Sequence, residues 1–243
     1  MQIAHGSTCN DALALPSARS QFRATVEVSR LAKNDQDAYL RHMFEFCLPT
    51  SAKVVPDGPE WCHEIKYDGF RLRVHRTGKR VRLFTRGGYD WTKRYPWIVE
   101  DAMKVRRDRF VLDGEAVVLG VDGISDFEAL YSRQCDDQAQ LYAFDVLAVD
   151  GEDLRDLPLS IRKTNLARLL ARRPDGIFVA PFETGEIGPY LFRAACNMGL
   201  EGMVSKHRDR PYRGGPCRHW VKVKNPASPA MKRAAEVDWS NSG

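Results

Sequence analysis

The sequence lacks the features that mark membrane-spanning and secreted proteins. None of its apolar runs approaches the roughly 20 residues that a membrane helix needs. The N-terminus has neither the basic start nor the long apolar core of a signal peptide, because Ala12 to Leu15 is broken by Pro16. We therefore expect a cytoplasmic protein with no membrane contact.

Paired cysteines with metal-binding spacing are also missing. The six cysteines include no C-x-x-C pair. Cys62 and Cys217 have a histidine nearby, but neither stands in the spacing of a structural zinc site. We expect ordinary thiols in a reducing compartment.

A strong charge imbalance is absent as well, since the net charge is only +5. The distribution of the charge is more informative, because basic residues gather in Arg71 to Arg82, Lys104 to Arg109 and Lys206 to Lys224. Basic clusters often line a polyanion site, although charged runs are commonly just solvated faces. Charge alone leaves nucleic-acid binding open.

The 243 residues suit one large domain, or one domain with appendages. Apolar residues alternate with polar ones in several short runs, as in half-buried strands, and other segments have helical spacing. Apolar runs also flank Asp113-Gly114-Glu115. Helices are expected over 95–105, 126–131 and 189–198, and one is expected to start at Ser160 as N-cap. Strands are expected over 61–66, 70–75, 80–85, 141–149, 177–182, 202–206 and 219–224. Strands in hairpin-like succession with interspersed helices predict an α+β domain of mainly antiparallel sheets with flanking helices, and not a doubly wound sheet.

Three regions follow from this pattern. Residues 1–46 form an N-terminal extension, partly disordered, with a short helix expected over 37–46. Residues 47–226 form the folded domain, which opens with an irregular lead-in before Trp61. Residues 227–243 form a C-terminal tail of linker character.

One short stretch carries the clearest chemistry, Glu64 to Arg71, in which a lysine is followed by an acid, a glycine and an arginine. Lysine becomes a nucleophile when burial or neighbouring positive charge lowers its pKa. Gly69 lets the backbone approach a ligand, and Arg71 can clamp a phosphate. A K-x-D-G sequence also recurs by chance as a polar strand end, so this stretch does not decide the function by itself.

Five stretches place a charged or aromatic residue within or at the end of a predicted strand. They are Lys66–Arg71, Asp113–Glu115, Phe144–Leu147, Glu201–Lys206 and Trp220–Lys224. Their order and content resemble the covalent nucleotidyltransferases, which include ATP-dependent DNA ligases and messenger-RNA capping enzymes. The surrounding residues, among them Thr85–Gly88 and Ala194–Gly202, look most like bacterial end-joining DNA ligases, and the resemblance covers about Leu48 to Pro226.

The resemblance implies a role for each matching residue around the nucleotide. Lys66 attacks the α-phosphate of ATP to form a lysyl-AMP, a task that needs a compact, deprotonatable amine. Glu64 matches the position that contacts the adenine edge. Glu115 matches the carboxylate that holds the ribose hydroxyls. Phe144 matches the ring that stacks on adenine, a contact worth roughly 1–3 kcal/mol.

The resemblance also implies a phosphate and metal end of the site. Arg71 and Arg86 match positions that contact the nucleotide and the nick phosphate. Glu201 matches a ligand of Mg²⁺ or Mn²⁺, for which a single carboxylate with phosphate oxygens and waters suffices. Lys222 and Lys224 lie on one face of a strand and match the pair that grips the α-phosphate.

Several assignments stay open from the sequence. Lys206 is either a phosphate contact or a surface charge, and either Val204 or Met203 packs on the second face of the adenine. Asp68 and Asp145 are expected to order the lysine and the strand turns without touching substrate. Taken singly, each site residue fits a core or solvated position, but five motifs in one order favour the functional interpretation.

The sequence departs from the ligase pattern after the last lysine motif, where an OB-fold domain normally follows. Asn225 to Gly243 is too short for the five strands of that fold. We therefore expect slow self-adenylylation, or help from an OB-fold or DNA-end-binding partner protein.

The function predicted from the sequence is that of an ATP-dependent DNA ligase acting in DNA repair or recombination. AMP passes from ATP to Lys66 and then to a 5′-phosphate, and a 3′-hydroxyl seals nicked double-stranded DNA. The protein is expected to be a monomer. An RNA ligase or capping-type nucleotidyltransferase is the enzymatic alternative, and a DNA-binding accessory module without turnover is the non-enzymatic one.

Overall fold

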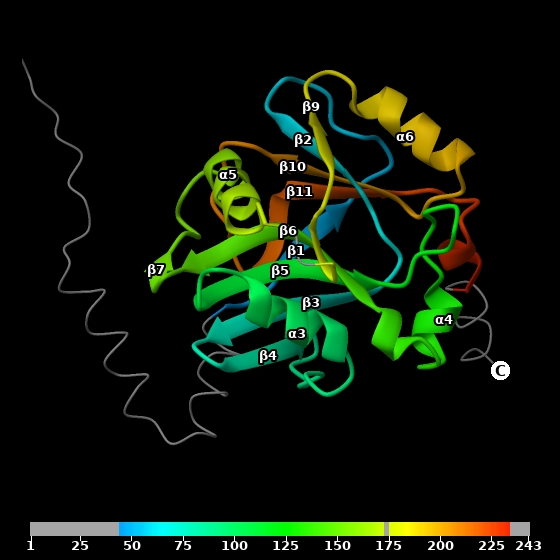
Figure 1. The fold of residues 1–243 in the computed structure, drawn as a ribbon. Helices are drawn as coiled ribbons and strands as arrows, with labels where there is room; N and C mark the ends of the chain where they lie inside the picture. Colours follow the sequence, from blue (N-terminus) through cyan, green and yellow to red (C-terminus); the bar gives the residue numbers. More distant parts are fainter. Residues whose placement is uncertain (1–43, 173–174, 234–243) are drawn as a thin grey trace, which may run out of the picture. The chain divides into compact units, whose positions relative to one another are not determined.

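A computed structural model describes residues 44–172 and 175–233, which form two β-sheets with flanking helices (Figure 1). The helix expected over 37–46 lies outside the described residues, except for Phe44 to Phe46, which are not helical. None of the described helices is both long and apolar enough to cross a membrane.

The first sheet, called sheet A, has five strands in the described residues, in the order β1-β11-β10-β2-β9. Neighbouring strands are antiparallel except for β1 and β11, which run parallel. The strands are β1 (Cys47–Ser51), β2 (Trp61–Ile65), β9 (Phe182–Thr184), β10 (Gly202–His207) and β11 (Gly215–Lys224).

The second sheet, called sheet B, has six strands in the same described ranges, in the order β4-β3-β5-β6-β7, with β8 pairing in parallel with β6. The strands are β3 (Phe70–Thr77), β4 (Arg80–Thr85), β5 (Arg109–Val117), β6 (Gln140–Val149), β7 (Glu152–Asp153) and β8 (Ile177–Val179). The α+β class and the mainly antiparallel pairing predicted from the sequence are confirmed.

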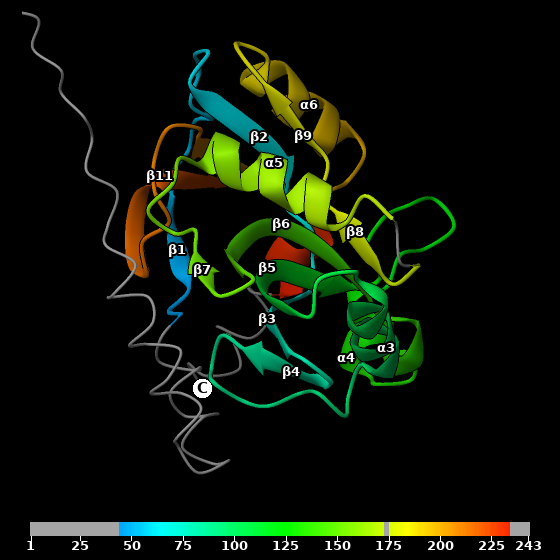
Figure 2. The same cartoon turned by 60° about the vertical axis from the view of Figure 1, so that its left-hand side comes forward.

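Helices cover the apolar faces of the sheets, and α5 lies along β6 (Figure 2). The helices are α3 (Pro96–Lys104), α4 (Phe127–Tyr131), η1 (Asp136–Gln138), α5 (Leu159–Leu169) and α6 (Gly188–Asn197). The main core packs Ile98 of α3 and Leu166 of α5 against Leu72 and Leu112 of sheet B. Burial of this apolar surface is the principal favourable term in folding. A second, smaller apolar cluster packs Val111 and Leu147 of sheet B against Trp220 of sheet A.

The structure corrects four expectations about elements. The lead-in expected to be irregular contains β1, and β5 runs unbroken through Asp113-Gly114-Glu115. The single strand expected over 177–182 is two short strands in different sheets, separated at Pro181, which has no N–H to donate. Helix α5 begins at Leu159 after Pro158, so Ser160 is not its N-cap.

Candidate active site

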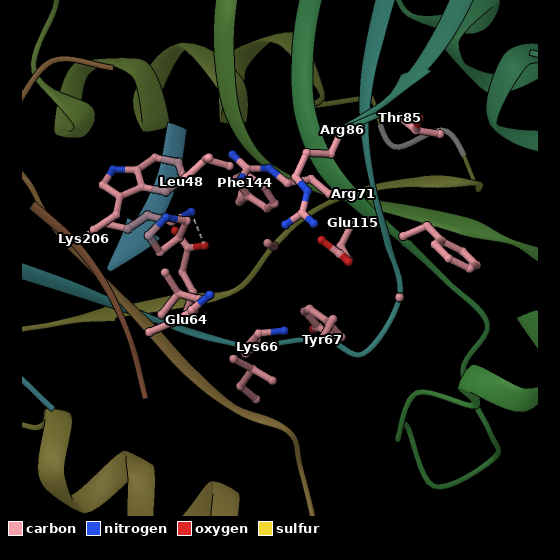
Figure 3. A pocket seen from close by; sticks show the side chains of 18 of the residues that line it. Leu48, Glu64, Lys66, Tyr67, Arg71, Thr85, Arg86, Glu115, Phe144 and Lys206 are labelled. Carbon is pink, nitrogen blue, oxygen red and sulfur yellow. Dashed lines mark hydrogen bonds and ion pairs between the residues drawn. The ribbon is translucent and has the colours of Figure 1, made fainter. Parts of the chain in front are cut away.

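A cavity of about 650 Å³ lies between the two sheets, within the size range of small-molecule sites. Eight of the nine site residues predicted from the sequence line it, namely Glu64, Lys66, Arg71, Arg86, Glu115, Phe144, Lys222 and Lys224. The ninth, Glu201, contacts Lys66 directly. The fold therefore gathers residues that are far apart in the chain, with Lys66 and Tyr67 on one side and Arg71 and Glu115 on the other (Figure 3).

Sheet A forms the floor of the cavity through residues that are opposite one another in neighbouring strands. Val204 of β10 pairs with Glu64 of β2 and with Lys222 of β11, and all three side chains line the cavity. Met203 points to the other face, because successive residues of a strand alternate, and it is buried against Leu200. The residue of this pair that can cover an adenine face is therefore Val204.

Sheet B forms the facing wall. Arg71 of β3 and Glu115 of β5 are direct cross-strand neighbours, and Phe144 follows on β6. Gly69, just before β3, allows the close approach of this wall, since a Cβ at this position would lie 2.2 Å from the carbonyl oxygen of Ala116. A larger residue at position 69 would push β3 away from β5.

The predicted nucleophile stands in an ion pair at the end of β2. Lys66 Nζ lies 2.5 Å from Glu201 Oε2, and Lys224 Nζ lies 3.4 Å from Glu201 Oε1. The backbone N–H of Lys66 donates to the carbonyl of Gly202 at 3.0 Å, so the two motifs are fixed to each other through sheet A as well. A single carboxylate thus holds two of the lysines that were predicted to act on the α-phosphate.

Positive charge is concentrated beside this pair. Burial lowers the pKa of Lys222, and the neighbouring charges of Lys224, Lys66 and Arg86 lower it further. The charged form of Lys222 is destabilised by burial and by the neighbouring positive charges. An anionic ligand bound beside it would offset that cost. This end of the cavity is therefore suited to an anionic ligand such as a phosphate group.

The pKa of Glu115, on the facing sheet, is shifted upwards, whereas that of Lys222 is shifted downwards. Burial raises the pKa of Glu115 to about 7, although Lys66 and Arg71 favour the charged form. Near neutral pH the carboxyl group is present in both protonation states, and it can accept or donate a hydrogen bond. Both states suit contact with sugar hydroxyls, the role that was predicted for it.

Arg71 is engaged in a network that the sequence did not indicate. Its Nε and Nη2 donate to the two carboxylate oxygens of Asp113 at 2.9 and 2.7 Å, and Nη1 donates to the carbonyl of Cys47 at 2.7 Å. Tyr212 Oη donates to the same Asp113 at 2.7 Å. Arg71 thus braces the wall at the cavity, and its contact with a nick phosphate stays a prediction.

The far end of the cavity is aromatic and holds a buried lysine. Lys206 Nζ lies 3.9 Å from the centre of the Phe144 ring and 4.1 Å from that of Trp220, distances at which cation–π attraction is strong. Burial lowers the pKa of Lys206 to about 8. Because the residue is only 2% exposed, the surface-charge alternative is wrong.

Glu64 also lies in this end, with both of its carboxylate oxygens engaged. Oε2 is 2.6 Å from Lys206 Nζ, and Oε1 is 2.5 Å from Lys163 Nζ of α5. Lys163 was not predicted from the sequence, and neither was a role for Trp220. Trp220 is two residues before Lys222 on the same strand, so strand alternation alone could have placed it at the site.

The two aspartates expected to have structural roles pair with arginines. Asp145 forms a fully buried ion pair with Arg162 of α5, at 2.8 Å. Asp68 pairs with Arg233, which also lies 4.6 Å from the centre of the Phe127 ring. Neither aspartate lines the cavity, as expected for residues that order the chain around the lysine.

The described part of the chain contains no cluster of three or more His, Cys, Asp or Glu side chains that could hold a metal ion unaided. Glu201 is the carboxylate beside the cationic end of the cavity. This donor set fits Mg²⁺, which is usually held by one or two carboxylates together with substrate phosphates and waters. It does not fit a structural zinc ion, which needs four protein ligands.

Comparison with known proteins agrees with this geometry. The sequence model of the ATP dependent DNA ligase domain matches residues 40–224. The multifunctional non-homologous end joining protein LigD of Pseudomonas aeruginosa is 34% identical over 206 residues, which are 83% of this chain and 24% of that protein. A probable DNA ligase of Streptomyces coelicolor is 38% identical over 179 residues, 66% of this chain and 34% of that protein. The chain thus spans about a quarter to a third of the length of these relatives.

The solved structures agree as well. A mycobacterial DNA ligase D in complex with ATP superposes with a TM-score of 0.65 at 33% identity, covering 75% of this chain and 60% of that one. The ligase domain of Mycobacterium tuberculosis LigD gives a TM-score of 0.60 at 32% identity, covering 73% and 60%. The covalent nucleotidyltransferase fold predicted from the five motifs is thereby confirmed. The chain belongs to the ATP-dependent DNA ligase domain family.

Proposed function

We propose that this chain is the adenylylation domain of a DNA ligase that uses ATP to seal nicks in double-stranded DNA. The observation that carries the proposal is the position of Lys66. Its amine stands in the cavity 2.5 Å from Glu201, beside Lys222 and Lys224. This arrangement supports a covalent lysyl-AMP better than simple nucleotide binding, since three amines converge where one phosphate would be held.

The first step forms a bond between Lys66 Nζ and the α-phosphorus of ATP and breaks the bond to the β-phosphate, so that pyrophosphate leaves with the electron pair. The ammonium of Lys66 must lose a proton before attack, and the carboxylate of Glu201 is placed to hold that proton. Lys222 and Lys224 would spread the charge that builds on the phosphoryl oxygens.

Two further steps complete the reaction. The AMP passes from Lys66 to the 5′-phosphate of the nick, where a phosphoanhydride forms as the phosphoramidate breaks. The 3′-hydroxyl then attacks that 5′-phosphate and AMP leaves. Arg86, exposed at the mouth of the cavity, is placed to meet the nick phosphate.

The nucleoside would lie between the two sheets. Phe144 and Val204 come from opposite sheets and can cover the two faces of the adenine, while Glu115 can hold the ribose hydroxyls. Glu201 would help to hold Mg²⁺ or Mn²⁺, which would neutralise phosphate charge when bound.

The names of the relatives support a role in DNA repair by end joining, because the LigD proteins are named for that process. We propose nicked DNA as substrate and a DNA-end-binding or OB-fold protein as partner. The domain bounds of 47–226, the monomeric state and the cytoplasmic location stay predictions.

The intact mass of the purified protein tests the covalent step. Incubation with ATP and Mg²⁺ is expected to add one AMP to the wild type and none to Lys66→Ala. Incubation with GTP is expected to add nothing, which separates a ligase from a capping-type enzyme.

Two results would contradict the proposal. The first is a wild type that gains no AMP with Mg²⁺ or Mn²⁺ and also fails to seal a pre-adenylylated nick, which would favour the binding module. The second is a gain of GMP in preference to AMP.

A further inference from the structure

Helix α5 is attached to both sheets through two consecutive buried side chains. Arg162 donates from Nε and Nη2 to the two oxygens of Asp145 in sheet B, both at 2.8 Å. Lys163 Nζ lies 2.5 Å from Glu64 Oε1 in sheet A. All four side chains are at most 4% exposed.

These two pairs end at the walls of the nucleobase site. Asp145 follows Phe144 on β6, and Phe144 lines the cavity from sheet B, whereas Glu64 lines it from sheet A. Arg162 and Lys163 are consecutive residues of one hydrogen-bonded helix, so their backbone positions are fixed relative to each other. A movement of α5 would therefore act on both walls of the nucleobase site, through Asp145 beside Phe144 and through Glu64.

The helix is itself held firmly at its N-terminus. The backbone N–H groups of Leu159 and Ser160 donate to the carbonyls of Arg210 and Arg208, at 3.1 and 2.9 Å. Arg208 and Arg210 lie in the connection from β10 to β11, the two strands that carry Val204 and Lys222. These bonds satisfy donors that a helix start leaves unpaired, and they tie α5 to the floor of the cavity.

The two lysines fix the orientation of the Glu64 carboxylate. Lys163 takes one oxygen and Lys206 the other, and the Lys163 ammonium is also 4.5 Å from the centre of the Phe182 ring. Oε1 is buried beside Lys163, whereas Oε2 accepts from Lys206 and retains a second lone pair as an acceptor site. With its orientation fixed, the Glu64 carboxylate can accept a hydrogen bond from a base that presents an amino group to it. It repels a base that presents a carbonyl oxygen at the same position.

We propose that α5 sets the width and polarity of the nucleobase site, with Lys163 as a positioning residue that makes Glu64 select adenine over guanine. This inference rests on the proposed function, in which the cavity binds a nucleotide. Lys163 lies outside the five motifs. Adenine carries an exocyclic amine where guanine carries a carbonyl, so a mobile Glu64 would lose selectivity more than it loses phosphate binding.

The test measures equilibrium binding by calorimetry with α,β-methylene-ATP and α,β-methylene-GTP, which cannot donate their nucleotidyl group. Lys163→Met is expected to weaken binding of the adenine analogue about ten-fold or more, and to reduce the ratio of the adenine to the guanine affinity by a similar factor. Lys163→Arg, which keeps the charge, should restore most of that ratio. Arg168→Met, at an exposed position of the same helix, should leave both affinities unchanged.

A wild-type affinity ratio in folded Lys163→Met would overturn the proposal, even if its melting temperature fell, because a merely structural role lowers stability without changing base selectivity. If Lys163→Met does not fold, Lys163→Gln is used in its place: it removes the charge and keeps a donor, so it is expected to reduce the affinity ratio by a smaller factor, and an unchanged ratio would overturn the proposal as well. Failure of the proposed function is distinguishable, because a wild type that binds the adenine analogue selectively but never gains AMP would contradict only the chemistry.

Discussion

At the scale of single residues, the site separates two carboxylates by their surroundings. Glu201 lies between two lysines, with carboxylate oxygens 2.5 Å from Lys66 Nζ and 3.4 Å from Lys224 Nζ. Glu115 is half-buried on sheet B, and desolvation raises its pKa to about 7. Pairs of acids with different surroundings can take different roles in one site. In the proposed reaction, Glu201 would take a proton from Lys66, whereas Glu115 would contact the sugar.

The raised pKa of Glu115 has a consequence for stability. The folded pKa of about 7 lies above the ordinary value of 4.5, so folding is favoured by protonation of this group. The stabilising contribution is fully present below pH 4.5 and is lost as the pH rises towards 7. Relative to Glu115→Gln, the free energy of unfolding of the wild type should therefore fall by about 1–3 kcal/mol over that window.

Urea unfolding of both proteins at several pH values from 4.5 to 8 measures this difference. The other titrating groups are common to the two proteins and cancel in the comparison. A difference that is flat across the window, or that rises with pH, would show that Glu115 is not held in a destabilising environment.

The sequence revealed the residues that form motifs but not the partners that orient them. Lys66, Glu115 and Lys222 could be predicted because each stands in one of the five motifs that resemble the covalent nucleotidyltransferases. Lys163 could not, because its partner Glu64 is on a distant strand and a lysine on a helix is usually solvated. Lys206 was ambiguous for the same reason, since burial depends on the packing of Phe144 and Trp220 over it.

At the scale of elements, the connection into β10 brings the metal-binding candidate to the nucleophile. Gly202 has a φ of +144° next to Glu201, and its carbonyl accepts the N–H of Lys66. A Cβ at this glycine would lie 2.2 Å from the carbonyl oxygen of Val223. The position tolerates only glycine, because both the backbone conformation and the space exclude a side chain.

Gly202→Ala should therefore destabilise the protein by more than about 2 kcal/mol and should also slow AMP transfer to Lys66, since Glu201 and Lys66 would shift. Gly78→Ala is the matched control, because Gly78 also has a positive φ, +59°, with open space around its Cβ position. The control should cost about 1 kcal/mol and leave AMP transfer unchanged.

Urea unfolding and labelling with radioactive ATP measure the two effects. Equal losses of stability in the two variants would contradict the packing argument. Normal AMP transfer by Gly202→Ala would contradict the link between β10 and the nucleophile.

Elements with strong local patterns were predicted well, and elements that depend on distant partners were not. The hairpin of β3 and β4 follows from alternation and from the Thr77-Gly78-Lys79 turn. Strand β1 has no such pattern, and it is extended because it pairs in parallel with β11. The division of 177–182 between two sheets likewise reflects tertiary contacts, such as the bond from Ala180 N–H to Ala143.

At the scale of the domain described by residues 44–172 and 175–233, the two sheets contribute different kinds of residue to one cavity. Sheet A supplies the amines and Val204, and sheet B supplies Arg71, Glu115 and Phe144. Without a nucleotide, the sheets are joined through α5, through the bond from Arg71 to Cys47 of β1, and through the packing of Phe144 on Lys206 and Trp220. A bound nucleotide would add base, sugar and phosphate contacts to both sheets at once.

Nucleotide binding should therefore stabilise the domain as a whole. At one hundred times the dissociation constant, α,β-methylene-ATP should add about 2.7 kcal/mol to the free energy of unfolding, because a ligand that binds only the folded state stabilises it by mass action. Hydrogen exchange should slow in β10 and β11 and also in β5 and β6. Inorganic tripolyphosphate, which has no nucleoside, should protect only sheet A, around β11, the strand that carries Lys222 and Lys224.

Thermal unfolding and hydrogen exchange read by mass spectrometry distinguish these outcomes. Protection confined to sheet A with the nucleotide analogue would mean that Phe144 and Glu115 do not contact it, and the assignment of the base and sugar positions would fall. Protection of both sheets by tripolyphosphate would instead mean that phosphate binding alone closes the cavity. Only the combination of wide protection by the nucleotide and narrow protection by tripolyphosphate fits a site in which each sheet recognises a different part of ATP.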